Sequence, residues 1–192
     1  MRQKRIISNM VIKTNFLKVN RMPNHPIYVR IATENEIPYF KNRSAAEAVI
    51  GAVIDAQKQD WMQLHGFVVL PEALEFVATP IKQAVTGLVA HIQAETIPPL
   101  AILLPNATGI WERHFMQIPL GTQRALDARL AMLLLAPVAG GIVDMAAGYP
   151  YSSANSRYAA SVTVYSDFIK RSTVEVAKIT ETPKPSGASS VA

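Results

Sequence analysis

Residues 64–80, LHGFVVLPEALEFVATP, decide the expected fold. Two runs in this segment, Leu64–Leu70 and Leu74–Thr79, are rich in Val, Leu and Phe, and the turn residues Pro71 and Glu72 separate them. Short β-rich runs on either side of a turn are typical of a β-hairpin. The segment therefore predicts two adjacent antiparallel strands near the middle of the chain.

The residues before the hairpin predict a strand and a helix. Ile27–Thr33 alternates apolar and polar side chains, as a half-buried strand does. Ser44 is the expected N-cap of a helix that runs to Lys58, with Glu47 completing a capping box.

The residues after the hairpin predict a helix, a strand and a second helix: Pro80–Ala94, Ile110–Ile118 and Gly121–Leu135. Pro98 and Pro99 predict a loop, and Pro137 is expected to end the last helix because proline cannot donate the next backbone hydrogen bond. A further strand or helix is expected over Ala160–Ile169.

This order of elements is the split β-α-β layout of ferredoxin-like α+β folds. We expect an antiparallel sheet with helices on one face, plus a C-terminal helix. The expected divisions are a basic N-terminal arm over 1–23, an α+β domain over 24–158, a C-terminal extension over 159–179 and a disordered tail over 180–192.

The composition is that of a globular protein. Of the 192 residues, 49% are hydrophobic and 17% charged, so the chain can bury a core. There is no cysteine, which excludes disulfides and thiolate metal sites. The longest apolar runs are too short for a transmembrane segment, and no secretory signal is recognisable. We therefore expect a cytoplasmic location.

Positive charge is concentrated at the N-terminus. Residues 1–30 contain seven Lys and Arg and no acid, whereas the other 162 residues carry 12 basic and 14 acidic side chains. Such an arm can bind phosphate backbones, an anionic membrane or an acidic partner, or it can be a solvated tail. The candidate nucleic-acid contacts are Arg2, Lys4, Arg5, Lys13, Lys18 and Arg21.

The hairpin and three later segments resemble one family. The strand from His65, its Leu70-Pro71-Glu72 turn and the following apolar strand are similar to the central hairpin of the single-tyrosine HUH transposases, most closely the REP-associated tyrosine transposases. Further similarities, in matching order, are Pro26–Val29 with Pro38-Tyr39-Phe40, then Ile110–Phe115, then Ala136–Val143 with Tyr149–Ala154. The resemblance covers residues 24–158 and implies a transposase-like domain.

The resemblance implies a DNA transposition chemistry whose residues this chain lacks. The family holds Mg²⁺ or Mn²⁺ with two histidines on one strand and attacks the scissile phosphate with a tyrosine. The histidine positions are Ala73 and Glu75 here, and the tyrosine position is Met132. We therefore expect no catalytic residue, no metal and no cofactor. Met132 is expected to pack in a core stripe with Leu126, Leu130 and Leu133.

Histidines elsewhere do not restore a metal-binding pair. His25, His65, His91 and His114 are at least 23 residues apart, so we expect His65 and His114 to be satisfied by the backbone. A residual metal site of Glu75 with Glu72 or His65 stays open as a hypothesis.

Three functions follow. The first is a catalytically inactive transposase-like pseudoenzyme that binds a DNA hairpin or single strand through the arm, with Trp111 and Phe115 as candidate stacking residues. The second is a structural or accessory subunit that uses the fold to dock in a larger protein assembly. The third is an active transposase with unusual residues. The resemblance also implies a homodimer.

Overall fold

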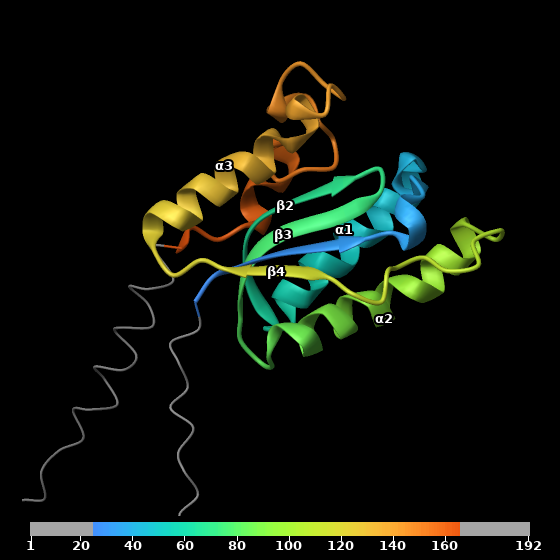
Figure 1. Ribbon diagram of the computed structural model, residues 1–192, viewed down its shortest axis with the longest axis horizontal. Coiled ribbons are helices and arrows are strands. Elements are labelled where there is room, and N and C mark those ends of the chain that lie inside the picture. The colour runs from blue at the N-terminus through green and yellow to red at the C-terminus, as the bar shows by residue number, and fades with distance from the viewer. Residues whose placement is uncertain (1–24, 166–192) are drawn as a thin grey trace, which may run out of the picture.

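The structure, a computed structural model, describes residues 25–165 (Figure 1). Its strands are β1 (Ile27–Ala32), β2 (Met62–Leu70), β3 (Ala73–Pro80) and β4 (Met116–Pro119). Its α-helices are α1 (Arg43–Lys58), α2 (Val85–Leu103) and α3 (Gln123–Ala139). Short 3-10 helices are η1 (Glu34–Glu36), η2 (Tyr39–Lys41), η3 (Ala146–Gly148) and η4 (Ser156–Ser161).

The four strands form one sheet in the order β2-β3-β1-β4, and every neighbouring pair is antiparallel. The predicted hairpin is β2 with β3, where Phe67 lies opposite Phe76. The predicted ferredoxin-like α+β fold is therefore confirmed. β2 has a register shift between Leu64 and Gly66, which changes the faces to which its side chains point.

The sheet is buried on both faces. Helices α1 and α2 lie together behind one face, and α3 lies over the other (Figure 1). The first layer contains most of the large buried side chains, among them Val29, Phe40, Phe67, Phe76 and Leu88. The second layer is smaller and joins Leu126 and Leu133 of α3 to apolar side chains of the sheet, which are Tyr28, Val68 and Val77.

The segment after α3 seals the free edge of β2. The Val69 N–H donates to the Tyr151 carbonyl at 2.8 Å, and the Ser153 N–H donates to the Phe67 carbonyl at 2.9 Å. The Tyr149 hydroxyl donates to the Val69 carbonyl at 2.8 Å. Backbone groups that an edge strand would otherwise leave unpaired are thus satisfied within the chain.

Some predicted boundaries were wrong. The N-cap of α1 is Asn42, whose side chain accepts from the Ala45 N–H, and not Ser44. Pro80 ends β3, and α2 begins at Val85. Pro98 and Pro99 lie inside α2 because Thr96 and Leu100 are buried around them, and this packing outweighs the missing backbone hydrogen bonds.

The last predicted elements also differ. β4 is shorter than expected, and Trp111 forms only an isolated bridge with Thr33. α3 continues through the buried Pro137. Residues 160–161 belong to the 3-10 helix η4, and the rest of the expected element over Ala160–Ile169 lies partly outside the described residues. The arm over 1–23 and the tail over 180–192 also lie outside them.

Within residues 25–165, no helix combines the length and the apolar character that a bilayer crossing demands.

Replacing Phe76 by Ala tests how much the larger layer stabilises the fold. Phe76 of β3 is fully buried in the layer between the sheet and helices α1 and α2, so we expect Phe76→Ala to lower the free energy of unfolding by about 3–5 kcal/mol in urea denaturation. Ile102→Ala is the matched control because Ile102 is 80% exposed, and it should change the stability by less than about 0.5 kcal/mol. Equal losses in the two variants would contradict this layering.

Candidate functional site

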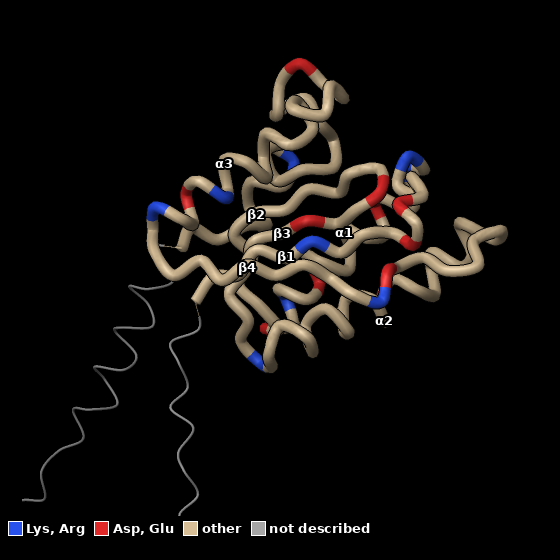
Figure 2. Tube along the Cα trace, viewed as in Figure 1, with Lys and Arg blue, Asp and Glu red and all other residues tan. Residues whose placement is uncertain are grey.

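A charged pair lies in the middle of the sheet, on the face that α3 covers. Arg30 of β1 is directly opposite Glu75 of β3. The Arg30 Nε lies 3.3 Å from the Glu75 Oε1, and the two side chains are 27% and 12% exposed. Figure 2 shows this basic segment of β1 beside the acidic segment of β3. The carboxylate is thus largely withdrawn from water and neutralised by a neighbouring strand.

Two further side chains extend this cluster. The guanidinium of Arg129, on α3, lies 4.5 Å from the ring centroid of Tyr28. Tyr28 lies two residues before Arg30 on the same face of β1. Burial, and to a lesser extent the negative charge of Glu75, raises the pKa of Tyr28 well above its usual value. The Tyr28 phenol therefore stays protonated near neutral pH. A second Arg30 nitrogen lies 3.7 Å from Glu36, which is mostly exposed.

The two positions that the resemblance assigns to histidines occupy this same face. Ala73 and Glu75 are two residues apart on β3, and so their side chains point to the same side of the sheet. Ala73 is fully buried and opposite Ala32, and it has no ligand atom. A cation at Glu75 would have to displace Arg30. These residues do not fit a divalent metal, and across residues 25–165 no three His, Asp or Glu side chains are grouped to hold one.

The prediction that Met132 packs in the core was wrong. Leu126 and Leu133 of the expected stripe are buried, but Met132 is 62% exposed. Helical geometry explains the difference, because Met132 lies about 100° around α3 from Leu133, which faces the sheet. The thioether therefore projects away from β3.

His65 is held inside the protein. Its Nδ1 lies 2.9 Å from the Thr163 carbonyl oxygen, and its Nε2 lies 2.9 Å from the Thr79 hydroxyl. Because a carbonyl only accepts, Nδ1 donates and Nε2 accepts from Thr79. Burial lowers the pKa of His65, so the ring is neutral. The expectation that backbone contacts satisfy this histidine is confirmed, with a threonine hydroxyl as the second partner.

The candidate stacking residues are engaged by the protein. Trp111 lies 5.2 Å from Phe40 between ring centroids, and its indole N–H donates to the Thr96 hydroxyl at 3.0 Å. Phe115 packs against the same core. Lys82, a basic residue between β3 and α2, contacts the Gln59 carbonyl with its ammonium and lies over the Trp61 ring. The six candidate basic residues of the arm lie outside the described part of the chain.

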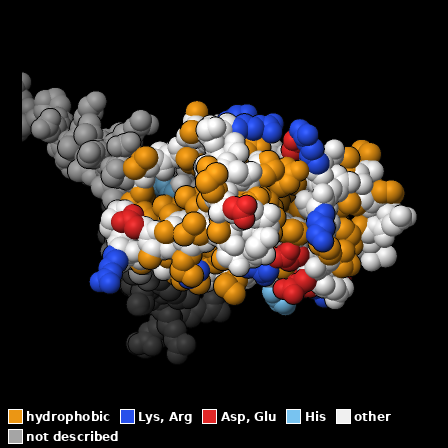
Figure 3. Space-filling model, turned by 90° about the horizontal axis from the view of Figure 1, so that it is seen from above, with side chains coloured by type: hydrophobic (Ala, Val, Ile, Leu, Met, Phe, Trp, Pro, Cys, Tyr) orange, Lys and Arg blue, Asp and Glu red, His pale blue; other side chains and the backbone are white. Residues whose placement is uncertain are grey.

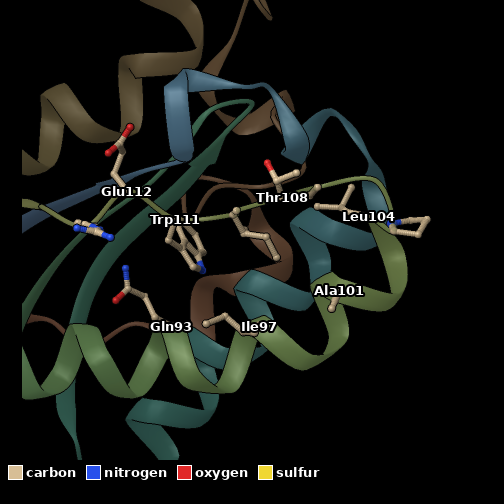
Figure 4. A pocket seen from close by; sticks show the side chains of 12 residues that line it. Gln93, Ile97, Ala101, Leu104, Thr108, Trp111 and Glu112 are labelled. Carbon is tan, nitrogen blue, oxygen red and sulfur yellow. The ribbon is translucent and has the colours of Figure 1, made fainter.

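A cavity of about 530 Å³ lies on the other side of the molecule, between α2 and the loop 104–113. Gln93 and Ile97 project toward it from α2, and Trp111 lies on the opposite side (Figure 4). Its lining is mostly apolar. The Trp111 N–H is already bonded, and the Glu112 carboxylate accepts from the Asn35 N–H at 3.0 Å. Both of these polar groups thus already have a partner within the protein.

The sequence did not reveal the Arg30–Glu75 pair or the contact of Arg129 with Tyr28. Strand alternation places Arg30 and Glu75 each on one face of its own strand, but only the register of β1 with β3 brings them together. The signal that was available is that each is the lone charge in an otherwise apolar strand.

His65 should make the stability depend on pH. Its pKa is lowered in the folded state, so the unfolded chain takes up the proton more readily. The stabilisation is therefore complete above the unfolded pKa of about 6.5 and is lost as the pH falls below it, by at most about 1.4 kcal/mol per pH unit. Urea unfolding between pH 7.5 and 5 should show this loss in the wild type and in His114→Gln. The loss should be reduced in His65→Gln, and an unchanged profile there would refute the assignment.

The Arg30–Glu75 pair can be measured with a double-mutant cycle. We expect Arg30→Met to lower the unfolding free energy by about 1–2 kcal/mol, because it leaves a largely buried carboxylate without a partner. Arg30→Met combined with Glu75→Leu should regain most of the loss, since no charge then remains to be desolvated. Strictly additive losses in chemical denaturation would show that the two side chains do not interact.

The sequence matches no protein-family model and no curated protein. Among solved structures, the chain is similar to a REP-associated tyrosine transposase bound to a REP hairpin, with a TM-score of 0.60 and 15% identity over 72% of this chain and 81% of that one. The crystal structure of a protein assigned as a transposase, from Deinococcus radiodurans R1, gives a TM-score of 0.44 and 10% identity over 56% of this chain and 87% of that one. The first of these likenesses shows that the chain has a transposase-like fold.

Proposed function

We propose that this protein is a catalytically inactive transposase-like protein that binds a DNA hairpin or single-stranded DNA. The transposase-like fold supplies the framework, and the chemistry of the sheet face under α3 supplies the reason for inactivity. The proposal leaves the positions Ala73, Glu75 and Met132 without a catalytic role.

The ion pair of Arg30 with Glu75 carries the inactive part of the proposal. A metal-dependent phosphoryl transfer needs ligands that are free to coordinate and a cation that polarises the phosphate. Here the one carboxylate at this place is neutralised by a guanidinium, and its neighbour at Ala73 is a methyl group. Burial and the negative charge of Glu75 raise the pKa of the nearby Tyr28 phenol and outweigh the opposing effect of Arg129, so the phenol stays protonated, which disfavours its use as a nucleophile.

Two arginines of α3, Arg124 and Arg129, support the nucleic-acid part. The Pro26 carbonyl accepts from the Leu120 N–H at 2.8 Å, so the first described residues lie beside the start of α3. The structurally similar transposase was solved with a REP hairpin. Because residues 31–192 are net acidic, the affinity should depend on the arm.

DNA binding can be tested by fluorescence anisotropy with a labelled DNA hairpin and its unpaired strand. If the six arm cations Arg2, Lys4, Arg5, Lys13, Lys18 and Arg21 each contact a phosphate, the logarithm of the affinity should fall with the logarithm of salt with a slope of about −5. Deleting residues 1–22 should abolish binding, whereas Lys58→Gln on α1 should not. Salt-independent binding, or none at micromolar protein, would remove this proposal.

Catalysis is tested separately. Incubation of the hairpin with full-length protein and Mg²⁺ or Mn²⁺ should leave the DNA uncut and form no covalent protein–DNA adduct on a denaturing gel. Tyr28→Phe should behave identically. Cleavage with adduct formation would restore the third function, an active transposase with unusual residues.

A second candidate is an accessory subunit of a larger protein assembly. The observation that favours it is the apolar surface on the α3 side, where Met132 and Leu135 are 62% and 52% exposed. Seen from above, this side shows hydrophobic side chains among scattered charges (Figure 3). Co-purification with a protein partner, and an absorbance ratio at 260 to 280 nm typical of protein alone, would favour this function. The homodimer that the resemblance implies stays a prediction for sedimentation analysis.

A further inference from the structure

The cavity between α2 and the loop 104–113 has the size of a small-molecule site. Its volume is about 530 Å³, and such sites usually measure about 300–1,000 Å³. Gln93, Ile97 and Ala101 line it from α2, and because they follow one another at intervals of four residues they share one side of the helix (Figure 4). Ile97 is 49% exposed. A ligand in the cavity would therefore remove apolar surface from water.

The loop side of the cavity is held in place by backbone hydrogen bonds. The Glu34 N–H donates to the Ile110 carbonyl at 3.0 Å, and the Glu112 N–H donates to the Ala32 carbonyl at 3.0 Å. These bonds fasten residues 110–112 to the end of β1. Both walls of the cavity are thus in position before a ligand arrives, and a ligand does not have to order them at the expense of affinity.

The charged side chains of the cavity lie at one end. The chain turns back after Leu104, and the indole N–H of Trp111 is bonded to Thr96, one turn of α2 after Gln93. The two residues after Trp111 therefore lie beside the Gln93 end of the cavity, far from Leu104. Figure 4 shows Glu112 at this end and Leu104 at the other. The cavity thus has a charged end and a mostly apolar body.

Arg113 is the cation at the charged end. It is exposed, and it forms no ion pair with any carboxylate of residues 25–165. The carboxylate of its neighbour Glu112 accepts from the Asn35 N–H instead. Gln93 adds a side-chain amide at the same end. A guanidinium and an amide N–H are both donors, so this end of the cavity is suited to an anionic group with acceptor oxygens.

We propose that this cavity binds a small carboxylate with an apolar body, such as an aryl carboxylate. The carboxylate group pairs with Arg113 and accepts from the Gln93 amide, and the apolar body lies along Ile97, Ala101 and Leu104. The site belongs to the α2 side of the sheet, whereas α3 covers the other face. Its occupation is therefore independent of the proposed binding of DNA.

Calorimetric titration of the full-length protein with 4-tert-butylbenzoate and with the neutral 4-tert-butylbenzamide tests the proposal. We expect the acid to bind with a Kd of about 0.1–1 mM and the amide about five- to tenfold more weakly, because the amide cannot form the charge-assisted hydrogen bond. Arg113→Gln should weaken the acid by the same factor and the amide by less than about twofold. Equal affinities of the two compounds, or no binding of the acid at about 10 mM, would overturn the proposal.

Two exposed alanines of α2 provide a matched pair of variants. Ala101 lines the cavity, whereas Ala90 lies outside it, about 16 Å earlier along the helix axis. Ala101→Phe should fill the cavity and abolish binding of the benzoate. Ala90→Phe adds the same ring and should leave the Kd within about twofold of the wild type. Wild-type affinity in Ala101→Phe would place the ligand elsewhere and contradict the proposal.

Tryptophan fluorescence provides a second measurement that does not depend on filling the cavity. The chain has two tryptophans, so Trp61→Phe leaves Trp111 as the sole indole. The benzoate should shift the Trp111 emission to shorter wavelength, since it displaces water from the cavity, with a midpoint equal to the calorimetric Kd. Adding Arg113→Gln should raise this midpoint. An unchanged spectrum at saturating benzoate would show that the ligand does not lie beside Trp111 and would refute the site.

Discussion

The constraint on which the structure depends is that β1 and β3 carry apolar side chains on both of their faces. Tyr28 and Val77 point to one side and Val29 and Phe76 to the other, so a layer is required on each side. The helices α1 and α2 supply one layer. The other must come from sequence beyond β4, and α3 fulfils this need. Because the outer surface of α3 is also apolar, burial of that surface is favoured as well.

The types and order of the elements could be predicted because they rest on local periodicity and on turn residues such as Pro71 and Glu72. Helix boundaries at prolines could not be predicted in this way, because tertiary packing decides whether a helix tolerates the backbone hydrogen bond that proline cannot donate. Pro137 is buried within α3, and Pro98 lies inside α2. The orientation of Met132 was wrong because it depends on which side of α3 meets the sheet, and Leu126 and Leu133 fix that side.

The chemistry of the candidate site could likewise be predicted from the sequence only in part. The sequence indicates which residues stand at the positions of interest, and the identities of Ala73 and Glu75 alone argue against a metal. The pairing of Glu75 with Arg30 adds what the sequence lacked, namely that the remaining charge is already compensated. Arg129 and Tyr28 come from α3 and β1, so their contact is a product of tertiary structure. Arg30, Glu75, Tyr28 and Arg129 thus form a polar cluster within an otherwise apolar layer.

The closure of the β2 edge has a consequence for biosynthesis. The groups that pair with Phe67 and Val69 lie at Tyr151 and Ser153, more than 80 positions later in the chain. When β2 and β3 have emerged from the ribosome, the edge of β2 therefore stays unpaired until residues 149–153 have been synthesised. Chaperone protection during that interval, and aggregation of products truncated before Tyr149, follow from this delay.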